Sequence, residues 1–238
     1  MKTTWKNSLM AAGLAALAAC SAKEQDQGAA HDAASAPQLS TPAPNDADAQ
    51  HSALLAAAEP FENLTEQAAT ATSGKLDTLI GDARKAGAVV APSLTAPQHS
   101  ALDDHLAAID AANKNGDRTA IALAAVEGYR TLVESASDTG PVPRAVSLLD
   151  YAGFRYEADL AATPPHWTDA ATAANYATSR WSALGGKVGD TALKDEVARA
   201  VGDMNVAAKT QDPSAARSAV GKELDLVDKL EAYFTKRP

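Results

Sequence analysis

The abundance of alanine and the spacing of the other apolar residues most constrain how this chain can fold. Apolar side chains recur three and four residues apart, aromatic residues make up only 5% of the chain, and runs of β-branched residues are scarce. Alanine is the strongest helix former, and this spacing places apolar side chains on one face of a helix. The pattern predicts an all-α fold with approximate helices at residues 61–89, 98–113, 118–136, 144–161, 168–185, 191–209 and 213–235.

Capping residues mark several of these helix boundaries. Asp117, Asp190 and Asp212 each precede a periodic segment, where an aspartate side chain can accept hydrogen bonds from the first backbone N–H groups of a helix. The connections between the predicted helices are short, which favours antiparallel neighbours. We therefore predict that residues 59–238, called the head below, form an antiparallel four-helix up-and-down bundle with additional N-terminal helices.

A weak internal repeat is visible within the head. The string Ser100-Ala101-Leu102-Asp103-Asp104 resembles Thr191-Ala192-Leu193-Lys194-Asp195, and each string leads through a helix to a second helix capped by aspartate. The repeat predicts two helical hairpins. Duplication explains it, and so do the common capping and helix-forming preferences of an alanine-rich chain.

The first twenty residues have the parts of a bacterial export signal. Lys2 and Lys6 give a positive start, and residues 8–19 form an apolar run that is too short to span a bilayer. The run ends in a tetrapeptide that resembles the lipobox of bacterial lipoproteins, Leu17-Ala18-Ala19-Cys20.

The lipoprotein resemblance carries several expectations. It implies that residues 1–19 are a cleaved signal peptide and that Cys20, the only cysteine, is acylated on its thiol and on its new amino terminus. The acyl chains would attach the protein to a membrane. Ser21, in place of aspartate, resembles the pattern of outer-membrane lipoproteins, so the expected location is the outer membrane, facing the periplasm.

The segment between Cys20 and the head reads as a tether. Residues 21–58 are rich in Ala, Gln, Asp, Ser and Pro and hold almost no large apolar residue before Leu54, so we predict a disordered tether over residues 20–58. The chain carries a formal net charge of −9, which argues against a nucleic-acid partner because phosphate binding needs clustered Lys and Arg.

Three acidic residues project toward apolar faces of the predicted helices. Asp150 and Glu157 lie along the margin of one apolar stripe, and Glu223 lies near the middle of the stripe on the last helix. A buried carboxylate must be neutralised, hydrogen-bonded, paired or bound to a metal. The three acids form either an oxygen-rich site for a divalent cation or cationic ligand, or a structural network with Arg155, Arg180 or tyrosine hydroxyls; we favour the network.

The sequence carries no recognisable enzyme motif. It has no Gly-x-Ser-x-Gly, His-Glu-x-x-His or phosphate-binding loop, and His31, His51 and His166 fall in the tether or in a loop. We predict no catalytic residues and no cofactor other than a candidate divalent cation. The favoured function is a non-enzymatic binding or structural module with an envelope protein partner; a ligand- or metal-binding lipoprotein is the alternative, and an enzyme ranks last.

Overall fold

The computed structural model describes residues 44–236, with side chains from residue 47 onward. This part of the chain contains no strand, and the predicted signal peptide and Cys20 lie outside it. Its α-helices are α1 (Pro44–Gln67), α2 (Ser73–Val90), α3 (Ala96–Asn115), α4 (Arg118–Ser135), α5 (Arg144–Ala161), α6 (Trp167–Leu184), α7 (Thr191–Thr210) and α8 (Pro213–Thr235). Short 3-10 turns follow α2 and α6.

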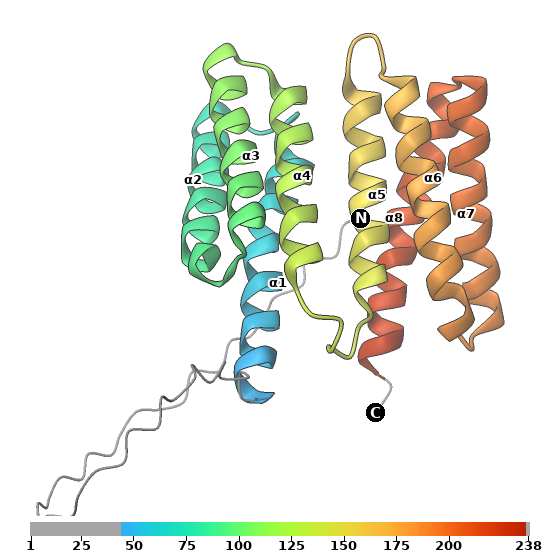
Figure 1. The fold of residues 1–238 in the computed structure, drawn as a ribbon. Helices are drawn as coiled ribbons and strands as arrows, with labels where there is room; N and C mark the ends of the chain where they lie inside the picture. The colour runs from blue at the N-terminus through green and yellow to red at the C-terminus, as the bar shows by residue number, and fades with distance from the viewer. Residues whose placement is uncertain (1–43, 237–238) are drawn as a thin grey trace, which may run out of the picture. The chain divides into compact units, whose positions relative to one another are not determined.

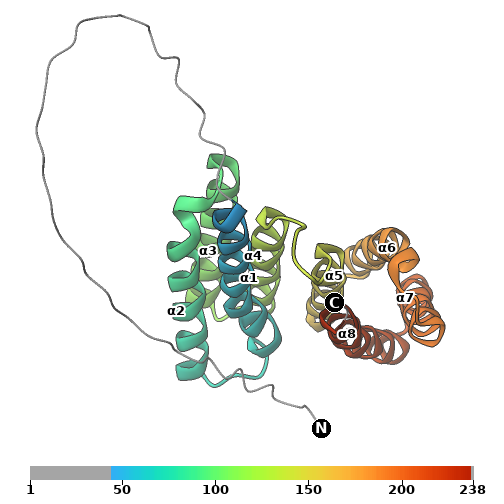
Figure 2. The same ribbon diagram turned by 90° about the horizontal axis from the view of Figure 1, so that it is seen from below.

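The helices form two four-helix bundles, whose separation along the chain can be followed in Figures 1 and 2. Helices α1–α4 make the N-terminal bundle and α5–α8 the C-terminal bundle, and the first and fourth helices of each pack together. The bundles meet along α4 and α5. The predicted all-α bundle is therefore confirmed, and its additional N-terminal helices make up a bundle of their own.

Most helix bounds agree with the prediction to within two residues, with one clear exception. The segment 61–89, predicted as one helix, belongs to two helices that are separated by residues 68–72. Thr72 caps the second of them by accepting a hydrogen bond from the Lys75 N–H. Asp117, Asp190 and Asp212 cap their helices as predicted.

The head begins earlier than predicted. Helix α1 starts at Pro44, so residues 44–58, which were assigned to the tether, are helical. Leu54, Ala57 and Ala58 are buried in the N-terminal bundle, and their burial stabilises the helix there. His51, which was also assigned to the tether, lies on this helix against Gly140 of the α4–α5 loop. The rest of the predicted tether lies outside the described residues.

The two bundles repeat each other along the chain. The first residues of α2 and α6 are 94 residues apart, and those of α3 and α7, and of α4 and α8, are 95 apart. Leu102, Ile109 and Ala112 of α3 are buried, as are the residues 95 positions later, Val197, Met204 and Ala207. The first residues of α1 and α5 are 100 residues apart because α1 is the longer helix, but their last residues, Gln67 and Ala161, are 94 apart. A spacing of 94 or 95 residues that recurs in helix bounds, caps and buried positions is what duplication of a four-helix unit produces.

The short strings that suggested a repeat are one helical turn out of register. They pair Ser100 with Thr191, whereas the helix bounds pair Ala96 with Thr191. An apolar stripe recurs every three or four residues, so short strings match almost as well after a shift of one turn. The predicted pair of helical hairpins, α3–α4 and α7–α8, is present.

None of the described helices is long and apolar enough to cross a membrane.

Candidate functional site

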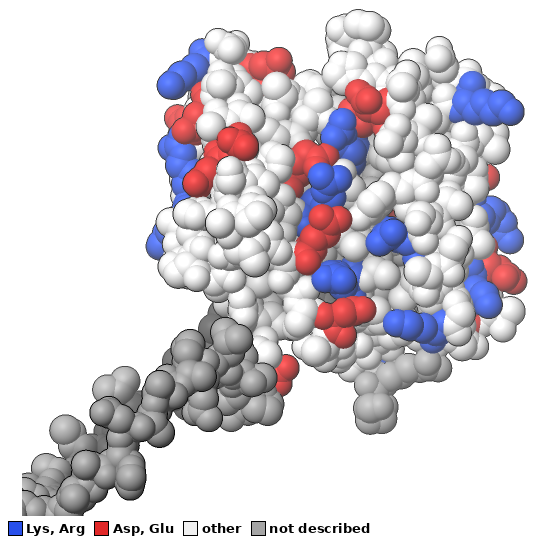
Figure 3. Space-filling view, viewed as in Figure 1, with Lys and Arg blue, Asp and Glu red and all other residues white. Residues whose placement is uncertain are grey.

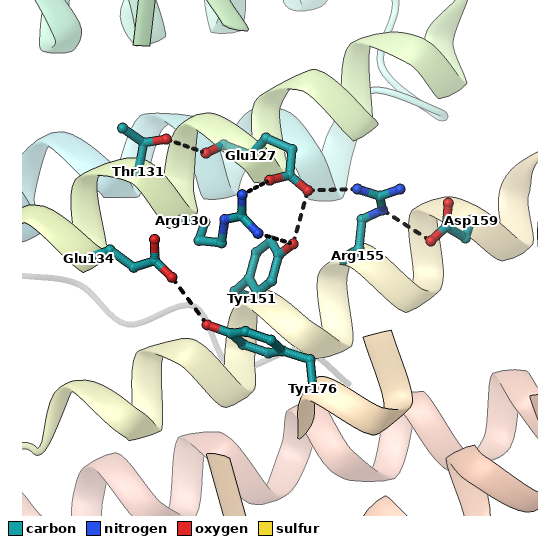
Figure 4. A network of polar contacts seen from close by, with 8 residues as sticks. All are labelled: Glu127, Arg130, Thr131, Glu134, Tyr151, Arg155, Asp159 and Tyr176. Atoms are coloured by element: carbon teal, nitrogen blue, oxygen red, sulfur yellow. Dashed lines mark hydrogen bonds and ion pairs between the residues drawn. The ribbon is translucent and has the colours of Figure 1, made fainter. Parts of the chain in front are cut away.

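A polar network joins the two bundles where α4 faces α5. We call Glu127, Arg130, Tyr151, Arg155 and Asp159 the inter-bundle network (Figure 4). Glu127 on α4 is its centre: its carboxylate accepts hydrogen bonds from Arg155 Nη1 (2.6 Å) and Tyr151 Oη (2.9 Å) and pairs with Arg130 (3.0 Å). Arg155 also donates from Nε to Asp159 Oδ2 (3.0 Å). Figure 3 shows acidic and basic side chains alternating along this boundary.

The charges of the network stabilise one another. Burial lowers the pKa of Arg155, but the carboxylates of Asp159 and Glu127 more than offset this and raise it above its usual value. Burial and Glu127 raise the pKa of Tyr151, which keeps its hydroxyl protonated as a donor. The contacts of Glu127 with Arg155 and Tyr151 link α4 to α5.

Beyond Arg155, the network ends in a cluster of three potential metal ligands. One ligand atom from each of Asp159, His166 and Asp169 lies within 4.8 Å of the other two. We call these residues the Asp–His–Asp triad. The triad is the only such group of three or more His, Cys, Asp or Glu residues in the part of the chain that the structure describes.

The turn between α5 and α6 positions the triad. Asp159 lies in the last turn of α5, His166 is the residue before α6, and Asp169 lies in the first turn of α6. The His166 N–H donates to the Asp159 carbonyl (3.0 Å), and the Asp169 N–H donates to the His166 carbonyl (3.0 Å). These backbone bonds bring residues from two helices to one end of the C-terminal bundle.

Asp159 has an incompletely satisfied carboxylate. Its side chain is fully buried, and Oδ1 has no hydrogen-bond partner in the described part of the chain although it lies 3.6 Å from His166 Nδ1. Burial raises the pKa of Asp159, Arg155 opposes the rise, and Asp169 adds to it. A buried oxygen without a partner costs free energy that a bound cation would recover.

A small pocket adjoins the triad. It has a volume of about 200 Å³ and lies between α4, α5 and α6. Its lining includes Asp169 together with Glu127, Arg130, Tyr151, Arg155, Thr172, Ala173 and Tyr176. An ion bound by the triad would therefore have a cavity beside it whose lining includes charged side chains.

The structure brings two of the three sequence-predicted acids close together. Glu223 on α8 is fully buried, and its carboxylate lies against Gly153 of α5, one turn from Asp150. Asp150 accepts a hydrogen bond from Tyr129 Oη (3.3 Å), a tyrosine hydroxyl of the kind that the network hypothesis expects. Glu157 is exposed, so it does not share the buried environment of Glu223. Arg155 pairs with Glu127 and Asp159 instead.

Asp150 and Glu223 belong to a larger group of acids between the bundles. Burial raises the pKa of Asp150 well above its usual value, and Glu62, Glu231, Glu223 and Asp228 raise it further. Burial alone raises the pKa of Glu223. Burial, with neighbouring acids, raises the pKa of Glu62 on α1 to about 8. Burial and mutual repulsion therefore favour the protonated form of these carboxyl groups, and no three of them converge as the triad does.

Sequence reasoning missed the triad. His166 was set aside because it follows two prolines in a loop, and Asp159 and Asp169 were not singled out. The available signal was Asp-x6-His-x2-Asp across a predicted helix–turn–helix, with both carboxylates within a few residues of the turn. That signal becomes specific only when the turn geometry is known, because surface acids next to turns are common.

Comparison of the chain with protein-family models, with curated proteins and with solved structures finds no match.

Proposed function

We propose that this protein is a lipid-anchored bacterial envelope protein whose helical head is a non-enzymatic binding module for a divalent metal ion. The anchor rests on the lipobox that ends at Cys20 and on the location expected from Ser21. An envelope protein is the expected partner of the head. The metal site rests on the geometry of the Asp–His–Asp triad.

One observation carries the metal site. The fully buried Asp159 directs an oxygen without a partner toward His166, and Asp169 completes three donor atoms within 4.8 Å. Two donors at about 2.0–2.2 Å from one ion lie at most about 4.4 Å apart, so small side-chain shifts suffice for coordination. Arg155 holds Oδ2 of Asp159 and so orients the carboxylate, as partners of metal ligands commonly do.

The donor set selects a class of ion. One imidazole nitrogen and two carboxylate oxygens suit a first-row divalent ion such as Zn²⁺ or Mn²⁺ better than Ca²⁺, which prefers six to eight oxygens. Three protein ligands leave coordination positions open for water or for a ligand in the adjoining pocket.

The N-terminal bundle supplies a variant that should lose the metal and keep the fold. Its residue equivalent to His166, 94 positions earlier, is Thr72, which already caps α2. His166→Thr therefore removes the imidazole and introduces a good capping residue. Asp159→Asn removes the buried charge, and Asp195→Asn on the exposed surface of α7 is a matched control.

The test is a calorimetric titration of the full chain carrying Cys20→Ser, stripped of metal, with Zn²⁺ and separately with Mn²⁺. We expect one ion per chain, at least tenfold weaker binding in His166→Thr and Asp159→Asn, and no change in Asp195→Asn. Absence of binding, or binding that both triad variants leave intact, would refute the site.

The anchor is tested separately by membrane fractionation of the expressed protein. Cys20→Ser should release the protein from the membrane fraction and block lipoprotein processing. Continued membrane attachment of this variant would contradict the lipoprotein assignment without bearing on the metal site.

A further inference from the structure

The opposite end of α5 carries a second pocket of different chemistry. It has a volume of about 410 Å³ and lies between the α4–α5 connection and the C-terminal end of α6. Its lining includes Arg144, Arg180, Lys187, Glu134 and Asp138. Arg144 and Asp159 are fifteen residues apart on one helix, about 22 Å, so this pocket is distinct from the triad.

The two acids of this pocket are already engaged. Glu134 Oε1 accepts a hydrogen bond from Tyr176 Oη (3.3 Å), and Asp138 Oδ1 accepts one from the Arg144 backbone N–H (2.8 Å). Neither acid forms an ion pair with Arg144 or Arg180 among the described residues. The guanidinium charges of the pocket are therefore not neutralised by the carboxylates that line it.

Arg180 is held in place with an unused donor. Its guanidinium lies over the Tyr176 ring, 4.9 Å from the ring centre, and its only hydrogen bond to a described residue is a long one from Nη2 to Ser179 Oγ (3.4 Å). Its Nε is buried and has no hydrogen-bond partner within residues 44–236. A fixed guanidinium with an unsatisfied buried N–H is the arrangement that binds a carboxylate or phosphate oxygen.

Arg144 presents a second cation to the same pocket. Its Nη1 donates to the carbonyls of Glu134 (3.1 Å) and Ala136 (2.9 Å) at the end of α4, where a positive charge is favourable. These bonds use one of its terminal nitrogens and leave the others available.

We propose that this pocket binds an oxyanion, the phosphate or carboxylate group of a small ligand or of a lipid headgroup, between Arg180 and Arg144. The volume matches that of a small-molecule site. The net charge of the chain cannot attract an anion to this pocket, because that charge is formally −9 and repels anions. Recognition would depend on the two guanidinium groups.

The probe for a free anion is inorganic phosphate, titrated calorimetrically into the full chain carrying Cys20→Ser in the presence of a chelator that keeps the triad empty. Sodium chloride at equal ionic strength serves as the reference. We expect one phosphate per chain. Arg180→Gln should weaken binding at least tenfold, because a charged hydrogen-bond donor is lost.

Two further variants make the phosphate result specific. Arg180→Lys retains the charge without the planar fork and should bind with intermediate affinity, which also keeps the test valid if Arg180→Gln folds poorly. Arg199→Gln, an exposed arginine on α7, removes the same charge elsewhere and should leave binding unchanged. Arg144 is not substituted because it supports the end of α4.

Vesicles distinguish the two sources of the oxyanion. The same protein is sedimented with phosphatidylglycerol vesicles and with phosphatidylcholine vesicles at one ionic strength. Retention on phosphatidylglycerol that Arg180→Gln abolishes identifies a lipid headgroup, and phosphate binding without such retention identifies a free anion. The proposal is overturned if neither probe binds, or if Arg180→Gln and Arg180→Lys leave both responses unchanged.

Discussion

The N-terminal and C-terminal bundles have the same arrangement of helices but different side chains in their cores. At equivalent positions of their second helices, α2 buries Leu76, Leu79 and Ile80, whereas α6 buries Ala170, Ala173 and Ala174. The small side chains let α6 lie closer to α5 and α7 than α2 lies to α1 and α3. The two bundles have the same helix arrangement because the spacing of their helices along the chain and the caps of those helices are the same. The side chains that fill their cores differ.

The two bundles also differ in the polar residues at the turn that holds the Asp–His–Asp triad. The positions equivalent to Asp159, His166 and Asp169 are Thr65, Thr72 and Lys75 in the N-terminal bundle, where Thr65 donates to a carbonyl of its own helix and Thr72 caps α2. The same turn thus serves only a structural purpose in one bundle and gathers three metal-ligand side chains in the other. The N-terminal bundle is an internal reference for what the turn needs in order to fold.

The largest expected effect comes from exchanging the core side chains of the two bundles. Ile80→Ala should lower the free energy of unfolding by roughly 2–5 kcal/mol, because the wider N-terminal bundle cannot close around the cavity. Ala174→Ile should cost roughly 1–3 kcal/mol by overpacking. Urea denaturation followed by circular dichroism measures both. A loss below about 1 kcal/mol for each exchange would mean that the two cores are interchangeable.

How far the sequence predicts this molecule differs between the fold and the site. Periodicity and the Asp117 and Asp212 caps located most helices, because these signals are local. The break at Thr72 was missed because the flanking segments share one apolar pattern. The joining of Asp159 to His166 depends on turn geometry, and that of Asp150 to Glu62 on contact between α5 and α1, so neither is encoded in local spacing.

The acids between the bundles predict that stability depends on pH. The pKa of Glu62 rises from 4.5 to about 8 on folding, so the folded chain keeps a proton that the unfolded chain has lost. This stabilisation is complete below pH 4.5 and is lost as the pH rises through about 8. For each proton that the folded chain retains, the free energy of unfolding can fall by at most about 1.4 kcal/mol per pH unit.

Glu62→Gln tests this dependence. Urea midpoints measured from pH 5 to pH 8 should fall with rising pH in the parent chain and fall less steeply in the variant, because the amide does not titrate. Asp195→Asn, which removes an exposed acid on α7, should retain the slope of the parent. Parallel slopes in the parent and in Glu62→Gln would show that Glu62 does not hold a proton in the interface.

Two buried glycines should differ in their tolerance of a methyl group. A Cβ on Gly128 would lie 2.5 Å from Cδ1 of the Phe61 ring, whereas one on Gly153 would meet the ends of the Glu223 and Leu224 side chains. Phe61 and Glu223 are both fully buried, but the Phe61 ring is rigid, whereas the Glu223 carboxylate and the Leu224 methyl groups are the ends of flexible side chains. We expect Gly128→Ala to cost about 1–3 kcal/mol in urea denaturation and Gly153→Ala less. The reverse order would place the tighter helix contact in the C-terminal bundle.

The smallest effects should come from the aspartate caps that the bundles share. Asp117 accepts one hydrogen bond, from the Ala120 N–H (2.9 Å), whereas Asp212 accepts two, from the Ser214 (2.9 Å) and Ala215 (3.0 Å) N–H groups. Substitution of either aspartate by alanine should cost about 1 kcal/mol, with the larger loss at Asp212, because two N–H groups lose their acceptor. Asp195→Ala, within α7, should cost less than either in the same urea titrations. Equal losses at all three positions would mean that the caps add no more to the stability of either bundle than an exposed aspartate within a helix.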